Sequence, residues 1–261
     1  WSLDTTDGPD QTQTVTITAD DGQGNPQSVT FDLTVNNQAP IVTPAVDQTG
    51  SEGSSVTFSL GSFADPGDDG DWLVLIDWGD ASSGDSFTSA APGSLASLSH
   101  IFADDGTYTV TVTVTEENGS GAAGFGSFQV TVGNEAPTFD PGVDQTSSEG
   151  AVFSAGTVAF NDLGTLDSHS ATINWGDGTA TEAGVVSESP FGPPGSAGGA
   201  SGTVVFADHV YADDGVYTVT ITITDDDETT TATLLVTVAN EAPTFDAASL
   251  TNTSPACGDS H

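Results

Sequence analysis

Residues 106–114 read Gly-Thr-Tyr-Thr-Val-Thr-Val-Thr-Val, and residues 215–223 read Gly-Val-Tyr-Thr-Val-Thr-Ile-Thr-Ile. In both segments, apolar residues alternate with threonine from the tyrosine onward. Side chains along a β-strand point to opposite faces in turn, so this alternation of β-branched residues predicts strands with one buried face. These two segments predict an all-β fold.

Further alternating runs surround each of these strands, at 56–60, 74–78, 128–132 and 234–238. Glycine- and aspartate-rich turns separate the runs, and no segment has the apolar stripe of an amphipathic helix. Short strands at regular spacing favour a β-sandwich. The sequence therefore predicts tandem immunoglobulin-like β-sandwiches.

The chain also repeats itself, and the repeats define the expected modules. Ala39-Pro40 recurs as Ala136-Pro137 and again as Ala242-Pro243. We expect two complete sandwiches, at 39–135 and 136–241, the second with a longer loop near 189–202. Residues 1–38 are expected to be the C-terminal part of a preceding module, and 242–261 the first strand of a following module or a tail. The chain is thus interpreted as a piece of a longer protein.

The charge balance excludes several classes of partner. The chain has no lysine or arginine and 38 carboxylates, for a formal net charge of −38. Binding to nucleic acid or to an anionic membrane surface needs basic groups, which are missing. No apolar run approaches the roughly 20 residues that span a bilayer, so no membrane insertion is expected in this segment. Counter-charges are expected from solvent cations, bound metal ions or a partner.

A second pattern links four residue types across each repeat. Trp-Gly-Asp ends one strand, a histidine with a nearby aromatic follows, and Asp-x-Gly-x-Tyr opens the alternating strand. The chain resembles the PKD (polycystic kidney disease) domain in this pattern, over residues 39–241. The matching residues are Trp78, Asp80, His100 and Tyr108 in the first repeat and Trp175, Asp177, His209 and Tyr217 in the second. Ala81 departs from the pattern, because the second repeat has the usual glycine there, Gly178.

The resemblance implies an extracellular or cell-surface location and a spacer, stalk or adhesive role. The N-terminal piece resembles the end of a cadherin-like module.

Most members of the pattern are expected to be structural. Tyr108 and Tyr217 have the form of a tyrosine corner, in which the buried hydroxyl bonds to nearby backbone. Tryptophans that close strands are expected in the core, which applies to Trp78 and Trp175. The repetition of His100 and His209 in both modules favours a scaffolding role.

Trp72 is set apart, because it follows an aspartate in an acidic loop. It is the candidate for an exposed contact residue, against the alternative that it folds onto its own module.

No catalytic constellation is found, and we expect no enzymatic activity. The paired carboxylates Asp104/Asp105 and Asp213/Asp214 superficially suggest a glycosidase. A glycosidase needs two carboxyl groups facing each other across a cleft, whereas these pairs are adjacent in a turn.

The acidic loops are instead candidate calcium ligands. The loop before the tyrosine strand is expected at the end where the chain leaves a module, and the loops after the second and sixth strands at the opposite end. Stacked modules would then bring together Asp104, Asp105, Glu135, Asp162, Asp167, Asp225, Asp226 and Asp227. Calcium takes six to eight oxygen ligands, which such a cluster can supply. The alternative is a solvated acidic surface, and the sequence leaves both open.

Two functions fit these observations. The first is a cation-stabilised structural or adhesive repeat segment of a large surface protein or fibre. Its partners would be other modules of the same chain, surface proteins or glycans. The alternative is an accessory spacer or carbohydrate-binding segment of a secreted hydrolase.

Overall fold

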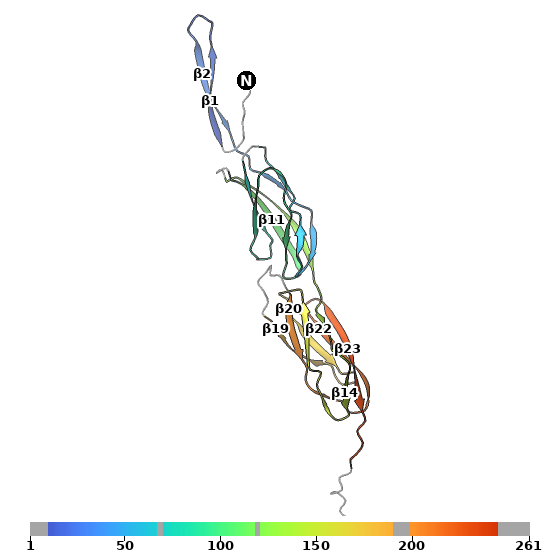
Figure 1. Cartoon of the computed structure of the whole chain (residues 1–261). Helices are drawn as coiled ribbons and strands as arrows, with labels where there is room; N and C mark the ends of the chain where they lie inside the picture. Colours follow the sequence, from blue (N-terminus) through green and yellow to red (C-terminus); the bar gives the residue numbers. More distant parts are fainter. Residues whose placement is uncertain (1–9, 67–69, 118–120, 190–198, 245–261) are drawn as a thin grey trace, which may run out of the picture.

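The computed structural model describes residues 10–66, 70–117, 121–189 and 199–244. Three units follow one another along one long axis (Figure 1): an N-terminal hairpin, a first sandwich and a second sandwich. Strands make up the regular structure of the described residues, which contain no helix. The predicted all-β, immunoglobulin-like fold is confirmed. The expected strand beyond residue 244 lies outside the described residues.

The N-terminal unit is a two-stranded antiparallel hairpin. It pairs β1 (Gln11–Ala19) with β2 (Gln27–Val35), and Val15 lies opposite Phe31. One face carries the apolar residues of both strands, and Ile17 and Phe31 are exposed on it. The corresponding faces of the two sandwiches are covered by a second layer.

The main sheet of the first sandwich has five strands, in the order β4-β12-β11-β7-β8. The parallel pair is β4 with β12, and the other pairs are antiparallel. The bounds are β4 (Gln48–Ser51), β12 (Ala123–Gly133), β11 (Gly106–Glu116), β7 (Trp72–Asp77) and β8 (Asp85–Ser89).

Shorter strands form the opposing layer of this sandwich. They make a three-stranded sheet, β3-β6-β9, and a two-stranded sheet, β5-β10. Their bounds are β3 (Ile41–Thr43), β5 (Val56–Phe58), β6 (Ser62–Ala64), β9 (Gly93–Ser94) and β10 (Leu98–His100).

The second sandwich repeats this plan, with β19 as an additional strand in the opposing layer. Its main sheet has the order β14-β23-β22-β17-β18, opposed by β13-β16-β20-β19 and by the pair β15-β21. The main-sheet bounds are β14 (Gln145–Ser148), β17 (Ser170–Asn174), β18 (Glu182–Ala183), β22 (Gly215–Thr224) and β23 (Thr229–Ala239). The opposing bounds are β13 (Thr138–Phe139), β15 (Val152–Phe153), β16 (Thr157–Asp162), β19 (Val185–Glu188), β20 (Ala200–Val205) and β21 (His209–Val210).

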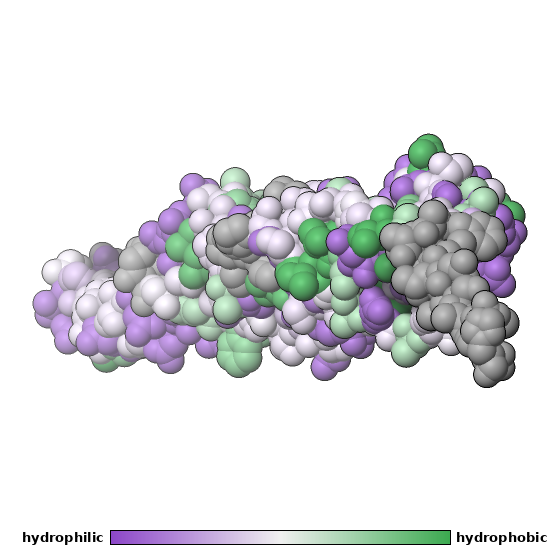
Figure 2. Space-filling view, turned by 90° about the horizontal axis from the view of Figure 1, so that it is seen from below, coloured by the Kyte–Doolittle hydropathy of each residue, from purple (hydrophilic) through white to green (hydrophobic). Residues whose placement is uncertain are grey.

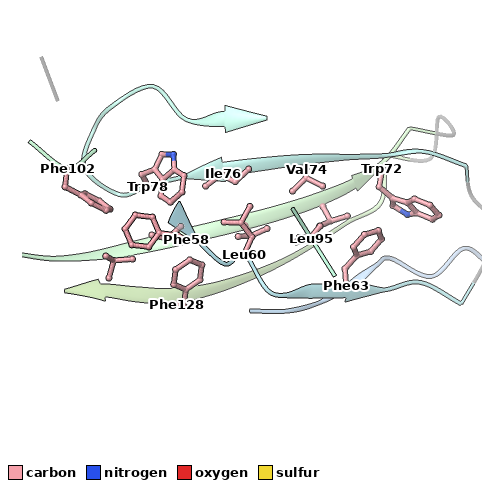
Figure 3. Close-up of a cluster of buried hydrophobic side chains, with 14 of the residues drawn as sticks. Phe58, Leu60, Phe63, Trp72, Val74, Ile76, Trp78, Leu95, Phe102 and Phe128 are labelled. Carbon is pink, nitrogen blue, oxygen red and sulfur yellow. The ribbon is translucent and has the colours of Figure 1, made fainter. Parts of the chain in front are cut away.

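Each sandwich has its own hydrophobic core. The alternation in β11 buries Val110, Val112 and Val114, and the partner strand β12 adds Phe128 and Val130. Figure 3 shows this core filling the length of the first sandwich. Burial of a large apolar side chain contributes about 1.5–3 kcal/mol, so packing can hold the layers together without a disulfide. On the face drawn in Figure 2, apolar residues lie in small groups among hydrophilic ones.

Candidate functional site: the junction between the two sandwiches

The Trp-Gly-Asp motif and the histidine form one structural unit. The imidazole of His100 stacks on Trp78, with ring centroids 4.4 Å apart and planes inclined by 6°. Its Nε2 lies 2.8 Å from the Asp80 carboxylate, and Phe102 packs edge-on against the ring. Burial tends to raise the pKa of Asp80, but hydrogen bonds from Ser82 and His100 outweigh it and lower that pKa. These contacts support a structural role for Trp78 and His100.

The second sandwich has the same unit. His209 stacks on Trp175 at 4.7 Å and contacts Asp177 at 2.8 Å. Both tryptophans are buried, as expected for core residues. The backbone at Ala81 has a φ of 62°, in the left-handed region that favours glycine, and Gly178 has a φ of 86° at the equivalent place.

Both tyrosines make the hydrogen bonds of a tyrosine corner. The Tyr108 hydroxyl donates to the Asp104 carbonyl at 2.9 Å, and the Tyr217 hydroxyl donates to the Asp213 carbonyl at 3.0 Å. The rings are only half-buried, which differs from the expected full burial. They lie at the module ends, where Tyr108 stacks on Phe102.

Trp72 is not an exposed contact residue; the alternative, that it folds onto its own module, is confirmed. Trp72 is buried, starts β7 and packs against Phe63 with ring centroids 5.4 Å apart (Figure 3). Its indole N–H donates to the Asp65 carboxylate. Trp72 is the first residue of an alternating run that buries Trp72, Val74 and Ile76, and this alternation explains its burial. The neighbouring Asp71 does not indicate whether Trp72 is buried.

Direct contacts join the end of the first sandwich to the start of the second. The backbone N–H groups of Thr165 and Leu166 donate to the Ala103 carbonyl, at 2.9 and 3.2 Å. Gly53 lies so close to Leu163 that a Cβ on Gly53 would be 2.1 Å from the Leu163 carbonyl oxygen. We call this region the junction: residues 52–53 and 102–105, the linker 134–135, and the loops 162–167 and 225–228.

The junction brings together seven of the eight carboxylates that the sequence singled out. Asp167 lies in one group with Glu52 and Asp104, and in a second group with Asp162 and Asp225. Within each group, one ligand oxygen per residue lies within 4.8 Å of the others. Burial raises the pKa of Asp104 and of Asp105, and the nearby carboxylates of Asp226 and Asp227 raise both further.

The eighth residue, Glu135, is at the junction through its backbone. Its N–H donates to Glu52 Oε1 at 2.7 Å. Among the described residues, its carboxylate belongs to neither converging group.

Two junction carboxylates are buried without enough partners. Asp167 and Glu52 are both 0% exposed. Both carboxylate oxygens of Asp167 lack a hydrogen-bond partner, and so does the Oε2 of Glu52. Burial, followed by the nearby Asp162, raises the pKa of Asp167 to about 7. Burial also raises the pKa of Glu52 to about 8, against the hydrogen bond from Glu135. A buried unpaired charge is costly, so this arrangement calls for a proton or a cation.

Sequence reasoning missed two junction residues. Glu52 occurs in the motif Ser-Glu-Gly, which is repeated at 51–53 and 148–150. This repetition is a usable signal, because a strand pattern does not require a glutamate at the same place in both modules. Asn134 precedes the repeated linker Glu-Ala-Pro; its side-chain amide donates to Asp225, and its Oδ1 is buried without a partner.

The far end of the second sandwich carries the equivalent of one half of the junction. Glu149, Asp213 and Asp214 converge there as Glu52 and Asp104 do, and Asp213 and Asp214 are exposed. The Glu241 N–H donates to Glu149 at 2.9 Å, as Glu135 does to Glu52. This end offers an internal comparison for the junction.

Histidine side chains are partners of carboxylates within the chain, in addition to the expected solvent cations, metal ions or a partner. Each histidine that the structure describes contacts a carboxylate: His100, His169 and His209. His169 lies between Asp162 and Glu188, at 3.0 and 3.2 Å. Burial tends to lower the pKa of His169, but the hydrogen bonds to these two carboxylates raise it.

Residues 37–132 match the model of the PKD domain family, which confirms the resemblance over the first sandwich. No curated protein matches the chain at a significant level. No helix of the described residues is long and apolar enough to cross a membrane.

Solved structures of several kinds are similar to the chain. An endo-fucoidan hydrolase of glycoside hydrolase family 107 is 16% identical, with a TM-score of 0.30, over 90% of this chain and 35% of that one. The extracellular cadherin domains 1–5 of protocadherin gamma B2 are 15% identical, with a TM-score of 0.30, over 88% of this chain and 45% of that one. The complex of Dpr2 Ig1-Ig2 with DIP-Theta gives 10% identity and a TM-score of 0.36, over 91% of this chain and 75% of that one. The chain thus spans less than half the length of the hydrolase and of the protocadherin.

Proposed function

We propose that the chain is a non-catalytic structural or adhesive segment of an extracellular or cell-surface protein, and that calcium holds its sandwiches in line. The observation that carries this proposal is the pair of buried, under-partnered carboxylates, Asp167 and Glu52, at the contact between two sandwiches. They come from opposite sides of the junction, so a cation between them would tie the two sandwiches together.

The choice of cation follows from the ligands. The converging groups consist of carboxylate oxygens, with the Asn134 Oδ1 beside them. Calcium binds such oxygen sets at 2.3–2.6 Å with flexible geometry, whereas magnesium keeps several waters and requires near-ideal octahedral geometry. Because the chain has no lysine or arginine, the nearest basic side chain described at these groups is His169, which contacts Asp162.

A mechanical role fits the contacts of the junction. Without a cation, carboxylates on both sides repel one another, and the backbone bonds from Thr165 and Leu166 hold the sandwiches together against that repulsion. Calcium would replace repulsion by ligation and so resist bending. Other modules of the same chain, surface proteins or glycans are the proposed partners, and a fibre is the proposed larger assembly.

The alternative role, binding carbohydrate, depended on an exposed Trp72, and Trp72 is buried. Trp72, Trp78 and Trp175, the tryptophans that the structure describes, are all buried. A sugar platform needs an exposed aromatic face. We therefore rank the accessory role of a hydrolase segment below the structural one.

Thermal unfolding tests the proposal. The full chain is unfolded in chelator, in calcium, and in sodium chloride of matched ionic strength. Calcium at 100 times its dissociation constant should add about 2.7 kcal/mol of stability. Sodium should act only by screening, over about 8 Å at physiological ionic strength. If calcium stabilises the chain no more than matched sodium, the acidic loops are only a solvated surface.

A further inference from the structure

We propose that the junction binds two calcium ions rather than one, and that the carboxylate of Asp167 bridges them. This inference rests on the proposed function, since it assumes that the junction takes up calcium, and it adds the number of ions and their coupling. It starts from the position of Asp167, the residue that both converging groups share.

Asp167 is placed to serve two ions. Its side chain is fully buried, and both of its oxygens lack a hydrogen-bond partner. Gly164 lies directly against it: a Cβ at Gly164 would be 2.1 Å from one carboxylate oxygen and 2.5 Å from the other. The glycine thus makes the room in which this carboxylate is buried. A carboxylate with two free oxygens can give one oxygen to each of two cations.

The first position lies within the second sandwich. It is formed by Asp162, Asp167 and Asp225. The Gly164 N–H holds Oδ1 of Asp162, and His169 Nε2 lies 3.0 Å from its Oδ2. Backbone N–H groups of residues 227 and 228 hold Oδ1 of Asp225. These bonds orient both carboxylates before any ion arrives. The unpartnered Oδ1 of Asn134 is a further ligand at this position, because the same side chain is bonded to Asp225.

The second position spans the two sandwiches. Glu52 and Asp104 come from the first sandwich, and Asp167 comes from the second. The Glu135 N–H holds Oε1 of Glu52, while Oε2 is buried and unpartnered. An ion at this position contacts both sandwiches, so it exists as a complete site only when they are docked.

Charge and distance both favour two ions over one. Two oxygens bound to the same calcium lie at most about 5 Å apart, since each calcium–oxygen distance is 2.3–2.6 Å. The two groups meet that limit separately and have only Asp167 in common. His169 partners Asp162, but one divalent ion would still leave part of the charge of the other four carboxylates unpaired in a largely buried place, which is costly.

The shared ligand couples the two positions. An ion at the first position fixes the Asp167 carboxylate and lowers the cost of presenting it to the second. Binding at one position therefore strengthens binding at the other, and the coupling is reciprocal. Calcium should straighten the junction over a narrow concentration range, with the second ion as the one that fastens the sandwiches.

Isothermal titration of the full chain with calcium, after removal of bound metal, tests the inference. We expect two tightly bound ions per chain and any further ion, at the exposed group with Asp213 and Asp214, to bind far more weakly. Asp167→Asn should abolish both tight ions. Glu52→Gln should remove one ion and leave the other bound more weakly than in the parent chain. The matched control is Glu149→Gln, which changes the equivalent glutamate at the far end of the second sandwich and should leave both ions.

Circular dichroism in chelator first establishes that each variant has the β-sheet content of the parent chain. If Asp167→Asn does not fold, Glu52→Gln and Asp225→Asn decide the question, because each should lose the tight binding of its own position and weaken the other. A single tight ion in the parent chain, or the loss of only one ion in Asp167→Asn, overturns the shared-ligand inference while leaving calcium binding intact. No tight ion at all would instead overturn the proposed function.

Discussion

Replacing Gly53 by alanine should separate the two sandwiches, and the same change at Gly150 should not. Both glycines have positive φ, 60° and 72°, and each donates its N–H to the carbonyl of an aromatic residue, Phe102 or Tyr211. An alanine in this region costs about 1–2 kcal/mol, which both variants share. The difference lies in the surroundings.

At Gly53 a Cβ would meet the Leu163 carbonyl oxygen at 2.1 Å, whereas at Gly150 nothing lies within 4 Å. Ordinary contact begins at 3.4 Å, so the loop of the second sandwich must retreat. That movement breaks the two hydrogen bonds to the Ala103 carbonyl, each of which contributes about 0.5–1.5 kcal/mol. Gly53→Ala should therefore lose about 1–3 kcal/mol more than Gly150→Ala.

Urea unfolding followed by circular dichroism measures this difference, and small-angle scattering reports whether the rod has become more flexible. Calcium should stabilise the Gly150→Ala variant as much as the parent chain and the Gly53→Ala variant much less. Equal losses of stability in the two variants, with equal responses to calcium, would refute the description of the junction as a tight contact.

Three further outcomes are expected. Without calcium, stability should fall as pH rises from about 5 to 8. Burial raises the pKa of Glu52 to about 8 and that of Asp167 to about 7. The folded chain therefore holds protons that the unfolded chain releases near pH 4 to 5. Thermal unfolding across this range in chelator should show the fall, calcium should remove it, and a flat profile in chelator would contradict the burial of these groups. Tyr108→Phe should cost about 1 kcal/mol through the lost hydrogen bond to backbone, and Tyr217→Phe should cost less because its hydrogen bond is exposed to solvent. An unchanged unfolding midpoint in both variants would contradict the tyrosine-corner assignment. Ala81→Gly should stabilise the first sandwich by about 1 kcal/mol, because Ala81 has a φ of 62°, which is strained for alanine and not for glycine. Denaturant unfolding measures the change. A loss of stability would show that the greater freedom of glycine in the unfolded chain outweighs the relief of this strain.

The fold could be predicted because its signal is local. Strict alternation in 106–114 and 215–223 sets which face each strand buries, and the structure buries Val110, Val112 and Val114 accordingly. The repeat then indicates two sandwiches, since the main sheets of both copies have five strands in the same order.

The candidate site could be predicted only in outline. The sequence indicates which loops carry carboxylates, and general sandwich topology indicates which ends they occupy. It does not indicate burial, which decides between a solvated surface and a cation site. Glu52 follows a strand of only four residues, which is too short for its alternation to predict that the Glu52 side chain is buried in the junction. Asp167 lies among carboxylates of its own sandwich and of the neighbouring one, an arrangement that no local pattern encodes.

Trp72 illustrates the opposite error. Its neighbour Asp71 suggested a loop, and the equivalent residue in the second repeat is His169. In the structure both side chains contact the same aspartate of their repeat: Trp72 donates to Asp65, and His169 contacts Asp162, the equivalent of Asp65 in the second repeat. An unlike pair of residues at one repeat position can thus share a hydrogen-bond partner that sequence comparison does not reveal.

The central claim is that calcium fixes the orientation of one sandwich relative to the other. Residual dipolar couplings of the full chain, measured in calcium and in chelator, test this most directly because each sandwich reports its own alignment. In calcium, both sandwiches should fit a single alignment tensor with one fixed relative orientation. In chelator, the two tensors should differ. Independent tensors in calcium, or one shared tensor in both conditions, would contradict the account.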